Sequence, residues 1–207
     1  SSFGDAVVRT APSGFVVMCN GEAFPAIRTD DGGATFTQLP NTGATFAAVM
    51  FRGGVVFATS GGAVSFHTDT TYTSGTGIGE GGINGACNGM VGTSGPDFAW
   101  TTTAGNIRRW NGASYSPIAV HPNGDPVLSC SLSFEGDYVL AGLAQSSADQ
   151  SNGGTRLSTD GGLTFGAVVD TGHADVEKVR VYDSGFAVAC GTGAPPAFSN
   201  DFGASWG

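Results

Sequence analysis

Charged residues, and lysine above all, are scarce in this sequence. Only 12% of the 207 residues are charged, Lys178 is the single lysine, and the formal net charge is −9. Nucleic-acid binding depends on lysine and arginine side chains that neutralise phosphates, so this composition excludes a nucleic-acid partner. It disfavours an anionic membrane surface for the same reason.

Long apolar runs and a helical period are also missing. No stretch approaches the roughly 20 apolar residues of a membrane-spanning helix, so we expect no membrane insertion. Hydrophobic residues nevertheless make up 40% of the chain, which excludes a disordered protein. No signal peptide is visible and the chain starts at Ser1 without methionine, so we expect it to belong to a longer chain or to an assembly.

Paired cysteine motifs are absent. Cys19, Cys87, Cys130 and Cys190 form no CxxC pair, which argues against a zinc or redox site, and no metal ligands are assigned. Two interpretations stay open: buried thiols, or disulfides in an exported protein. The Gly-, Ser- and Thr-rich composition favours an extracellular or cell-surface location. Cys87 and Cys130 lie in the first strands of adjacent repeats and form the favoured pair, whereas no Cys19–Cys190 disulfide is expected.

Glycine is abundant, with 35 residues, and much of it belongs to a repeated motif. Three segments fit Ser/Thr-x-Asp-x-Gly-x-Thr/Ser-aromatic: residues 29–36, 158–165 and 199–206, with their aspartates at Asp31, Asp160 and Asp201. A weaker copy at 108–115 has Trp110 in place of the aspartate, and another at 67–72 keeps Asp69. The copies recur about every 40 residues, which is the period of a four-stranded propeller blade.

Short apolar runs keep the same phase as the motif. One set of strands is expected at 14–20, 54–59, 97–102, 137–142 and 185–191, each preceded by a run at 6–10, 46–51, 83–90, 127–133 and 176–182. The sequence therefore predicts an all-β protein, a single five-bladed β-propeller domain over residues 1–207. The predicted blades span about 1–44, 45–82, 83–125, 126–174 and 175–207.

The motif itself predicts a rigid turn between the third and fourth strands of a blade. Its aspartate can accept backbone N–H bonds two residues on, and its glycine supplies a backbone angle closed to other residues. The three good copies resemble the Asp-box (BNR) repeat of sialidase-like and sortilin-like propellers. The resemblance covers nearly the whole chain and implies the propeller fold, but the family spans hydrolases, receptors and assembly proteins, so it implies no single activity.

Sialidase chemistry is not expected here. Sialidases hold the substrate carboxylate with three arginines, whereas the arginines of this chain lie beside the motifs, in innermost strands or in a tight turn, and the family's Arg-Ile-Pro start is absent. No nucleophile elbow, P-loop, dinucleotide fingerprint or HExxH motif is present. The sequence thus gives no evidence that the protein is an enzyme.

Candidate ligand-binding residues lie on the face opposite the Asp boxes, where second-to-third-strand loops and interblade links meet. The polar residues expected there are Glu22, Glu80, His121, Asp125, Asp149, Asp170, His173 and Asp175. The links 121–125 and 173–175 are the densest part and predict a polar pocket around His121, Asp125, His173 and Asp175. The alternative is solvated turn residues, because such residues dominate turns in any case.

Two further features are open. The long loop 145–155 contains Asp149 and Asn152, which hint at calcium, but it lacks the bidentate glutamate of an EF-hand, so no cofactor is assigned. Trp110 replaces a turn aspartate; exposed, it could stack on a sugar, and buried, it would pack.

The leading functional hypothesis is a non-catalytic binding or recognition propeller for a glycan or a protein at the face opposite the Asp boxes. The alternatives are a carbohydrate-active enzyme of the glycoside hydrolase type and a structural component of an extracellular or viral assembly. A last expectation concerns closure of the ring. Because the chain stops at Gly207 before a fourth strand of blade 5, residues 1–5 are expected to pair beside its third strand.

Overall fold

The computed structural model describes the strands given below and a nearly continuous C-terminal part. Besides the strands it describes residues 31, 34–36, 104–105, 120–126, 133, 137–138, 144–148, 153 and the segments between strands from 159 to 207. Side chains are described for residues 31, 34–37, 101, 104–108, 116–133, 137–148 and 153–207. The described residues contain strands, turns and loops but no helix, and therefore no helix that could cross a membrane.

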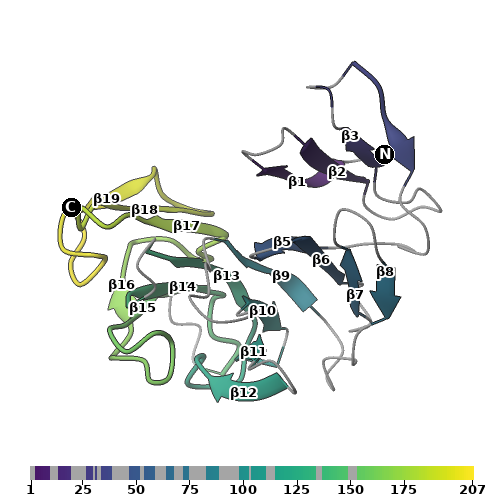
Figure 1. Cartoon of the computed structure of the whole chain (residues 1–207). Coiled ribbons are helices and arrows are strands. Elements are labelled where there is room, and N and C mark those ends of the chain that lie inside the picture. Colours follow the sequence, from purple (N-terminus) through teal and green to yellow (C-terminus); the bar gives the residue numbers. More distant parts are fainter. Residues whose placement is uncertain are drawn as a thin grey trace. The chain divides into compact units, whose positions relative to one another are not determined.

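The chain divides into two compact units, Ser1–Ile83 and Asn84–Gly207. The first unit contains two four-stranded antiparallel sheets in which each strand pairs with the next (Figure 1). The first sheet consists of β1 (Phe3–Arg9), β2 (Gly14–Cys19), β3 (Ile27–Thr29) and β4 (Thr37–Gln38). The second consists of β5 (Ala47–Phe51), β6 (Gly54–Ala58), β7 (Val64–His67) and β8 (Tyr72–Ser74).

The second unit contains three further groups of sequential strands. The first is β9 (Ile83–Asn88), β10 (Phe98–Thr102), β11 (Asn106–Trp110) and β12 (Tyr115–Ala119). The second is β13 (Val127–Leu132), β14 (Val139–Leu143), β15 (Gly154–Ser158) and β16 (Val169–Asp170). The third is β17 (Lys178–Val181), β18 (Ala187–Cys190) and β19 (Ala197–Ser199). The first two groups join through a short parallel pairing of β9 with β13.

The strands lie where the apolar runs predict them, and the boundaries differ by a few residues. The expected run at 14–20 is β2, and the run at 127–133 is β13. The largest difference is β1, which begins at Phe3 instead of residue 6. A register shift between Phe3 and Ala6 lets β1 continue beyond the apolar run, with Phe3 opposite Cys19 of β2.

Residues 3–5 lie within β1, which pairs with β2, and are not a segment that precedes the first strand. The expected pairing of residues 1–5 beside the third strand of the last group stays a prediction. The sheet β17–β18–β19 has three strands, and β19 is its edge. At that edge Phe198 and Gly207 exchange two backbone hydrogen bonds of 3.0 and 3.3 Å. Gly207 thus occupies the place that Gly166 has in the preceding group, where its N–H donates to the carbonyl of Leu157.

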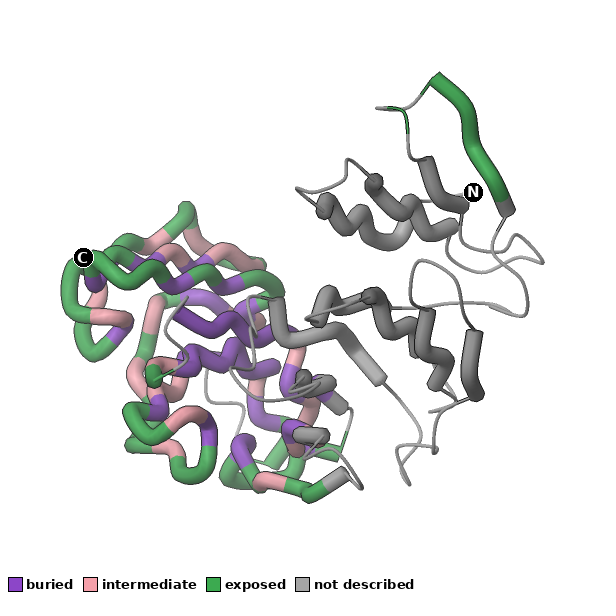
Figure 2. The backbone as a smooth tube through the Cα atoms, viewed as in Figure 1, coloured by how far each residue is buried: buried purple, intermediate pink, exposed green. Residues whose placement is uncertain are grey.

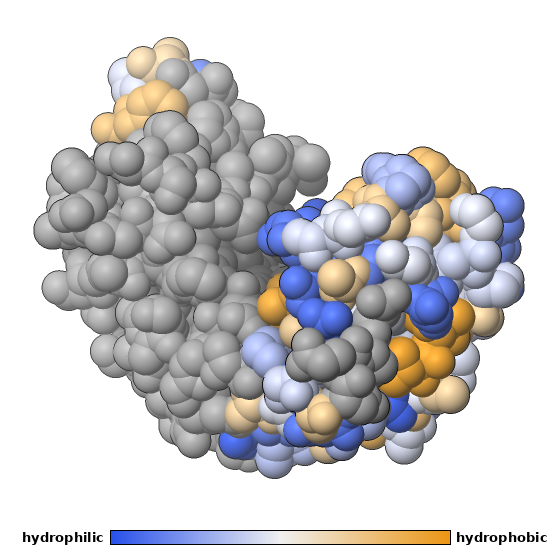
Figure 3. All heavy atoms as spheres, turned by 180° about the vertical axis from the view of Figure 1, so that it is seen from behind, coloured by the Kyte–Doolittle hydropathy of each residue, from blue (hydrophilic) through white to orange (hydrophobic). Residues whose placement is uncertain are grey.

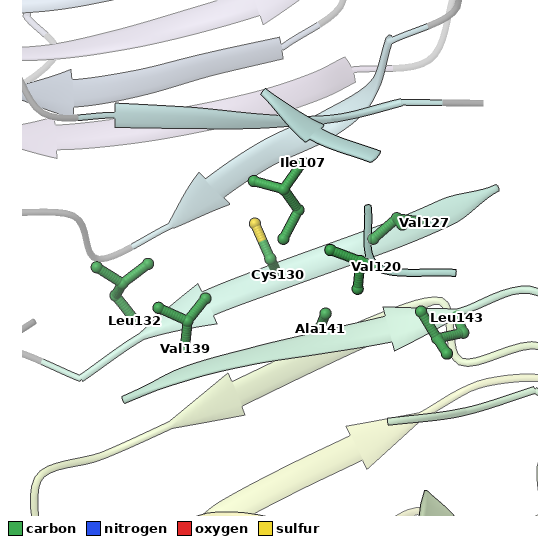
Figure 4. Packing of buried hydrophobic residues seen from close by; sticks show 8 residues of the cluster. All are labelled: Ile107, Val120, Val127, Cys130, Leu132, Val139, Ala141 and Leu143. Atoms are coloured by element: carbon green, nitrogen blue, oxygen red, sulfur yellow. The ribbon is translucent and has the colours of Figure 1, made fainter. Parts of the chain in front are cut away.

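Alternate side chains of β14 belong to two different hydrophobic clusters of the second unit. Val139, Ala141 and Leu143 point to one side, into a cluster with Ile107, Val120, Val127, Cys130 and Leu132 (Figure 4). Leu140 points to the other side, against Val176 and the buried face of β17–β18. Because successive side chains of a strand face opposite ways, an apolar strand packs on both faces. The β13–β16 sheet is accordingly buried between two neighbours, and Figure 2 shows the buried positions concentrated in its strands.

The surface of the described part carries both hydrophobic and hydrophilic residues. Figure 3, seen from behind, shows hydrophobic and hydrophilic residues side by side on it. Large hydrophobic side chains that stay exposed include Phe36, Leu163, Tyr182 and Phe198. Phe36 directly precedes β4 and Leu163 lies in the turn after β15, whereas Tyr182 directly follows β17 and Phe198 lies in β19.

Two cysteines of the second unit differ in state. Cys130 is buried and disulfide-bonded, and its Cα lies opposite that of Cys87 in the parallel pairing of β13 with β9. Cys190 is a half-buried free thiol on β18. The favoured pairing of Cys87 with Cys130 stays a prediction, and the register of these two strands is compatible with it.

Candidate functional site

The two ends of the strands in the second unit carry different structures. One end, the turn end, holds the hairpins β13–β14 and β17–β18 together with the aspartate turns that follow β15 and β19. The other end, the loop end, holds the links into β13 and β17 and the loops after β14 and β18. The antiparallel order of the strands places these sets at opposite ends of the sheets.

The turn after β15 is organised by Asp160. Its Oδ1 accepts the backbone N–H groups of Leu163 and Thr164 at 3.0 and 2.9 Å, and the Ser158 hydroxyl at 2.6 Å. Its Oδ2 accepts the Thr164 hydroxyl at 2.5 Å. These bonds, that from Ser158 first and those from Thr164 next, stabilise the carboxylate and hold the pKa of Asp160 far below its ordinary value.

The turn after β19 repeats this arrangement. Asp201 accepts hydrogen bonds from the Ser199 hydroxyl and from the N–H and hydroxyl of Ser205 at 2.6, 2.9 and 2.6 Å. Mainly through Ser199 and then Ser205, they lower the pKa of Asp201 to about 2. In the first unit, Asp31 between β3 and β4 accepts the N–H and hydroxyl of Thr35 at 2.8 and 2.6 Å. The backbone donors to the three aspartates lie three or four residues further along the chain, not two residues on as the motif predicts.

Each aspartate turn in the second unit is tied to the hairpin of its own sheet. The N–H of Gly161 donates to the carbonyl of Asp137 at 2.9 Å, and the N–H of Phe202 donates to that of Gly185 at 2.7 Å. Gly161 and Phe202 occupy the same position of the motif and both have left-handed backbone angles, φ of 70° and 62°. Phe202 adopts this disfavoured angle while its ring stacks on Tyr138 of the neighbouring sheet, with centroids 3.8 Å apart.

At the loop end, His121 fastens two segments together. The residue is 7% exposed, its Nε2–H donates to the carbonyl of Ala144 at 3.1 Å, and its Nδ1 accepts the N–H of Asn123 at 3.2 Å. With Nδ1 as the acceptor, the proton that bonds to the Ala144 carbonyl lies on Nε2. The Asn123 amide in turn donates to the Ser146 hydroxyl at 2.7 Å. The link into β13 is thus fixed to the loop after β14.

Asp125 and Asp175 hold the same loop from two links. Asp125 accepts the N–H and hydroxyl of Ser147 at 2.9 and 2.5 Å. Asp175, in the link into β17, accepts the N–H of Gln145 at 2.8 Å and the more distant Thr192 hydroxyl at 3.4 Å. Both carboxylates serve as acceptors for loop amides, so the structure brings the predicted residues to one loop and engages them in holding it.

His173 is the exception among these residues. It is fully buried, its Nδ1 lies 2.9 Å from the Thr171 hydroxyl, and its Nε2 has no hydrogen-bond partner among the residues that the structure describes. Most buried polar atoms are paired, so an unpaired ring nitrogen carries a desolvation cost that the rest of the link must offset.

The remaining predicted residues do not extend this site. Asp170 accepts the N–H of Gly172 at 2.7 Å, which is a local turn contact. Trp110 is the last residue of β11, opposite Tyr115 of β12, so the strand continues through the position where the motif would place a turn aspartate. An indole has no carboxylate to accept turn amides and favours strands. Glu22, Glu80, Asp69, Asp149 and Asn152 lie outside the described residues, within which no group of three or more metal-ligating side chains occurs.

Arg156 is a structural residue that sequence reasoning missed. Its guanidinium donates to three backbone carbonyls, those of Gly166, Val120 and Phe165, at 2.5, 2.6 and 2.8 Å. Burial lowers its pKa. Gly166 and Phe165 follow the aspartate turn of the β13–β16 sheet, and Val120 lies in the link before β13. The Arg156 side chain therefore joins the outer edge of this sheet to the link that leads into its first strand. The sequence showed only an arginine ahead of an aspartate turn, because carbonyl acceptors leave no trace in side-chain patterns.

Comparison with known proteins supports the fold. No protein-family model matches the sequence, and no curated protein matches it. Among solved structures, U3-55K matches with a TM-score of 0.71 at 10% identity, over 99% of this chain and 63% of that one. The RRP9 WD40 repeats match with 0.70 at 10% identity, over 99% and 62%. YCF48 from Cyanidioschyzon merolae matches with 0.66 at 14% identity, over 93% and 65%.

The present chain therefore spans less than two thirds of the length of each of these structures. WD40 repeats form β-propellers, so the likeness supports a β-propeller fold. At such low identities it shows the fold alone.

Proposed function

We propose that the chain is a five-bladed β-propeller of the Asp-box type, a single domain over residues 1–207 that acts as a non-catalytic binding scaffold. Five consecutive groups of antiparallel strands among the described residues, and aspartate turns that follow the third strand of three groups, support the architecture. A disulfide at Cys130 supports an extracellular or cell-surface location, because disulfides persist in oxidising compartments.

The binding surface that we propose is the loop end, with a protein or a glycan as its ligand. One observation carries the proposal: His121, Asp125 and Asp175 reach from two links to fix residues 144–147 of one loop. A loop held in this way is preorganised, and preorganisation lowers the ordering cost of binding. The candidate carboxylates accept amide hydrogen bonds, which is a positioning role and supports a scaffold better than a pair of acid and base groups.

The test uses two matched substitutions at exposed alanines. Ala148 lies at the loop end and Ala204 in an aspartate turn at the turn end, and both are exposed. A glycan array and a phage-displayed peptide library are screened with the wild-type chain, and the selected ligands are measured on A148R and A204R. We expect A148R to weaken binding about tenfold or more while A204R leaves it unchanged. Equal binding to both variants, or loss with A204R alone, would refute a site at the loop end.

A further inference from the structure

The third strand of the last sheet is shorter than its counterpart in the preceding sheet. β15 has five residues, Gly154–Ser158, whereas β19 has three, Ala197–Ser199. Both strands end at the serine that opens an aspartate turn, so the difference lies at their beginnings. Each of these serines pairs with the first residue of the second strand of its sheet, so the registers of the two sheets correspond.

The two positions that β19 lacks are occupied by prolines. Counted back from the serines, Pro195 and Pro196 correspond to Gly154 and Thr155 of β15. Gly154 and Thr155 are the residues that pair with β16, the fourth strand of that sheet. The last sheet therefore has prolines at the two positions where the preceding sheet binds its outer strand.

Pro196 removes a hydrogen-bond donor from the outer edge of β19. Phe198 and Gly207 exchange two backbone hydrogen bonds, so the N–H and C=O of Phe198 face this edge. Backbone groups of residues two apart on an antiparallel strand face the same edge, so the next outward donor would be the N–H of residue 196. Proline has no N–H. Beyond Phe198, therefore, only half of the next residue pair can form, through the carbonyl of Pro196.

Pro195 has the complementary effect on the inner edge. Ala197 pairs with Ala189 of β18, and the ladder between β18 and β19 stops there. In the preceding sheet the corresponding ladder continues by one more pair, Gly142 with Thr155. The backbone groups of residue 195 would face β18, as those of Ala197 do, and proline again supplies no donor. Its ring also fixes φ at about −65°, away from the extended values of an antiparallel strand.

The edges of the two sheets are limited in different ways. An edge strand with unpaired backbone groups can pair with a strand of another chain, and natural sheets prevent this with short edge strands or with prolines. The β13–β16 sheet ends on β16, which has only two residues. The last sheet ends on β19, beside the C-terminal Gly207, and has its prolines directly before that strand (Figure 1).

We propose that Pro195 and Pro196 close the edge of the last sheet to strand addition, so that β19 takes the single pair of Phe198 with Gly207 and no further strand. Pro196 removes the donor that a fourth strand would use, and Pro195 ends the ladder that would hold a longer β19 on β18. The limit applies to any extended segment, whether from this chain or from a second copy. Residues 1–5, whose pairing beside β19 is a prediction, would meet it too. The proposal is independent of ligand binding at the loop end.

The test offers β19 a fourth strand that the protein already uses elsewhere. Gly207 corresponds to Gly166, which is followed by Ala-Val-Val-Asp at residues 167–170, the segment that leads into and forms β16. This tetrapeptide is added after Gly207 of the full chain. In the preceding sheet the same four residues run beside β15, so their sequence is compatible with an outer strand.

The extension is compared in three backgrounds, wild type, P196T and P195G. P196T restores the outward donor with the residue that β15 has at this position, and P195G is the matched control, because it restores a donor that faces β18. An Ala-Pro-Pro-Asp extension, which lacks the donors for an outer strand, is the reference in each background. Amide hydrogen exchange of the added residues and the melting temperature are measured. Melting curves without an extension establish that each variant is folded, and P195G/P196T, which copies the Gly-Thr pair of β15, replaces P196T if the single variant is not.

We expect the amides of the Ala-Val-Val-Asp extension to exchange about tenfold more slowly in P196T than in wild type or P195G, because only P196T completes the next residue pair. The extension should raise the melting temperature above that of the reference in P196T alone. Three results would each overturn the proposal. Equal protection in wild type and P196T would show that the edge is open, equal lack of protection would show that the prolines do not close it, and equal protection in P195G and P196T would contradict the role of the outward donor.

Discussion

At Phe202 we expect a glycine variant to be more stable than an alanine variant, which reverses the usual order of stability. Its φ is 62°, and the corresponding residue of the preceding turn is Gly161 with φ of 70°. Replacing Phe202 by either small residue removes the ring and its stack on Tyr138. Only alanine retains the left-handed strain, which costs about 1–2 kcal/mol for a residue with a Cβ atom.

The expected difference follows from two opposing terms. Glycine avoids the strain but loses about 0.5–1 kcal/mol through the greater freedom of its unfolded chain. F202G should therefore be more stable than F202A by about 0.5–1 kcal/mol, and both should be less stable than wild type, because a stacked aromatic pair contributes about 0.5–1.5 kcal/mol beyond its buried area.

Urea denaturation at constant pH measures this difference. The control pair is T159A and T159G, at an exposed residue of the preceding turn that is not among the positive-φ positions. There alanine should be the more stable, as is usual. If F202A equals or exceeds F202G while the control pair behaves as expected, Phe202 is not strained and the reasoning is refuted.

Three further outcomes are expected. L140A should lower the free energy of unfolding by about 3 kcal/mol in urea, because Leu140 is fully buried between two sheets; a loss below about 1 kcal/mol would show that this packing is absent. The pKa of Asp201 is lowered to about 2, so the stability that its carboxylate contributes is complete above the unfolded value near 4 and is lost as the pH falls toward 2. D201N should therefore have a lower free energy of unfolding at neutral pH, and that free energy should change less between about pH 4 and 2 than it does in wild type. An equal loss of stability in D201N and wild type over this pH range contradicts the prediction. Non-reducing peptide mapping should recover Cys130 cross-linked, with Cys87 as the expected partner, and Cys190 as a free thiol; a cross-link from Cys130 to any other cysteine would refute that pairing.

The repeat made the strands readable from the sequence. Short apolar runs that recur in phase with the Ser/Thr-x-Asp motif located strands such as β2 and β13 within a few residues. The motif indicated an aspartate that accepts turn amides, but the donors lie three or four residues on instead of two, because the turn is longer than an Asx turn. The start of β1 could not be derived, since an irregular register at Phe3–Ala6 has no signature in an apolar pattern.

The contacts of the candidate site were harder to predict from the sequence than the strands were, and the reason is physical. His121, Asp125 and Asp175 were found as polar residues of links, but their common partner, residues 144–147, is recognised mainly through backbone groups. Backbone N–H and C=O groups are the same in every residue, so a sequence carries no mark of which of them a side chain will reach. The three carbonyls held by Arg156 were missed for the same reason.

The sequential order of strands also has a consequence for synthesis in the cell. Nearly every strand pair described joins neighbours along the chain, and the pairing of β9 with β13 is a short exception. Proteins dominated by such local contacts close small loops and fold quickly for β proteins. Each group of strands can therefore start to form as soon as its own residues leave the ribosome, before the groups that follow it have been translated.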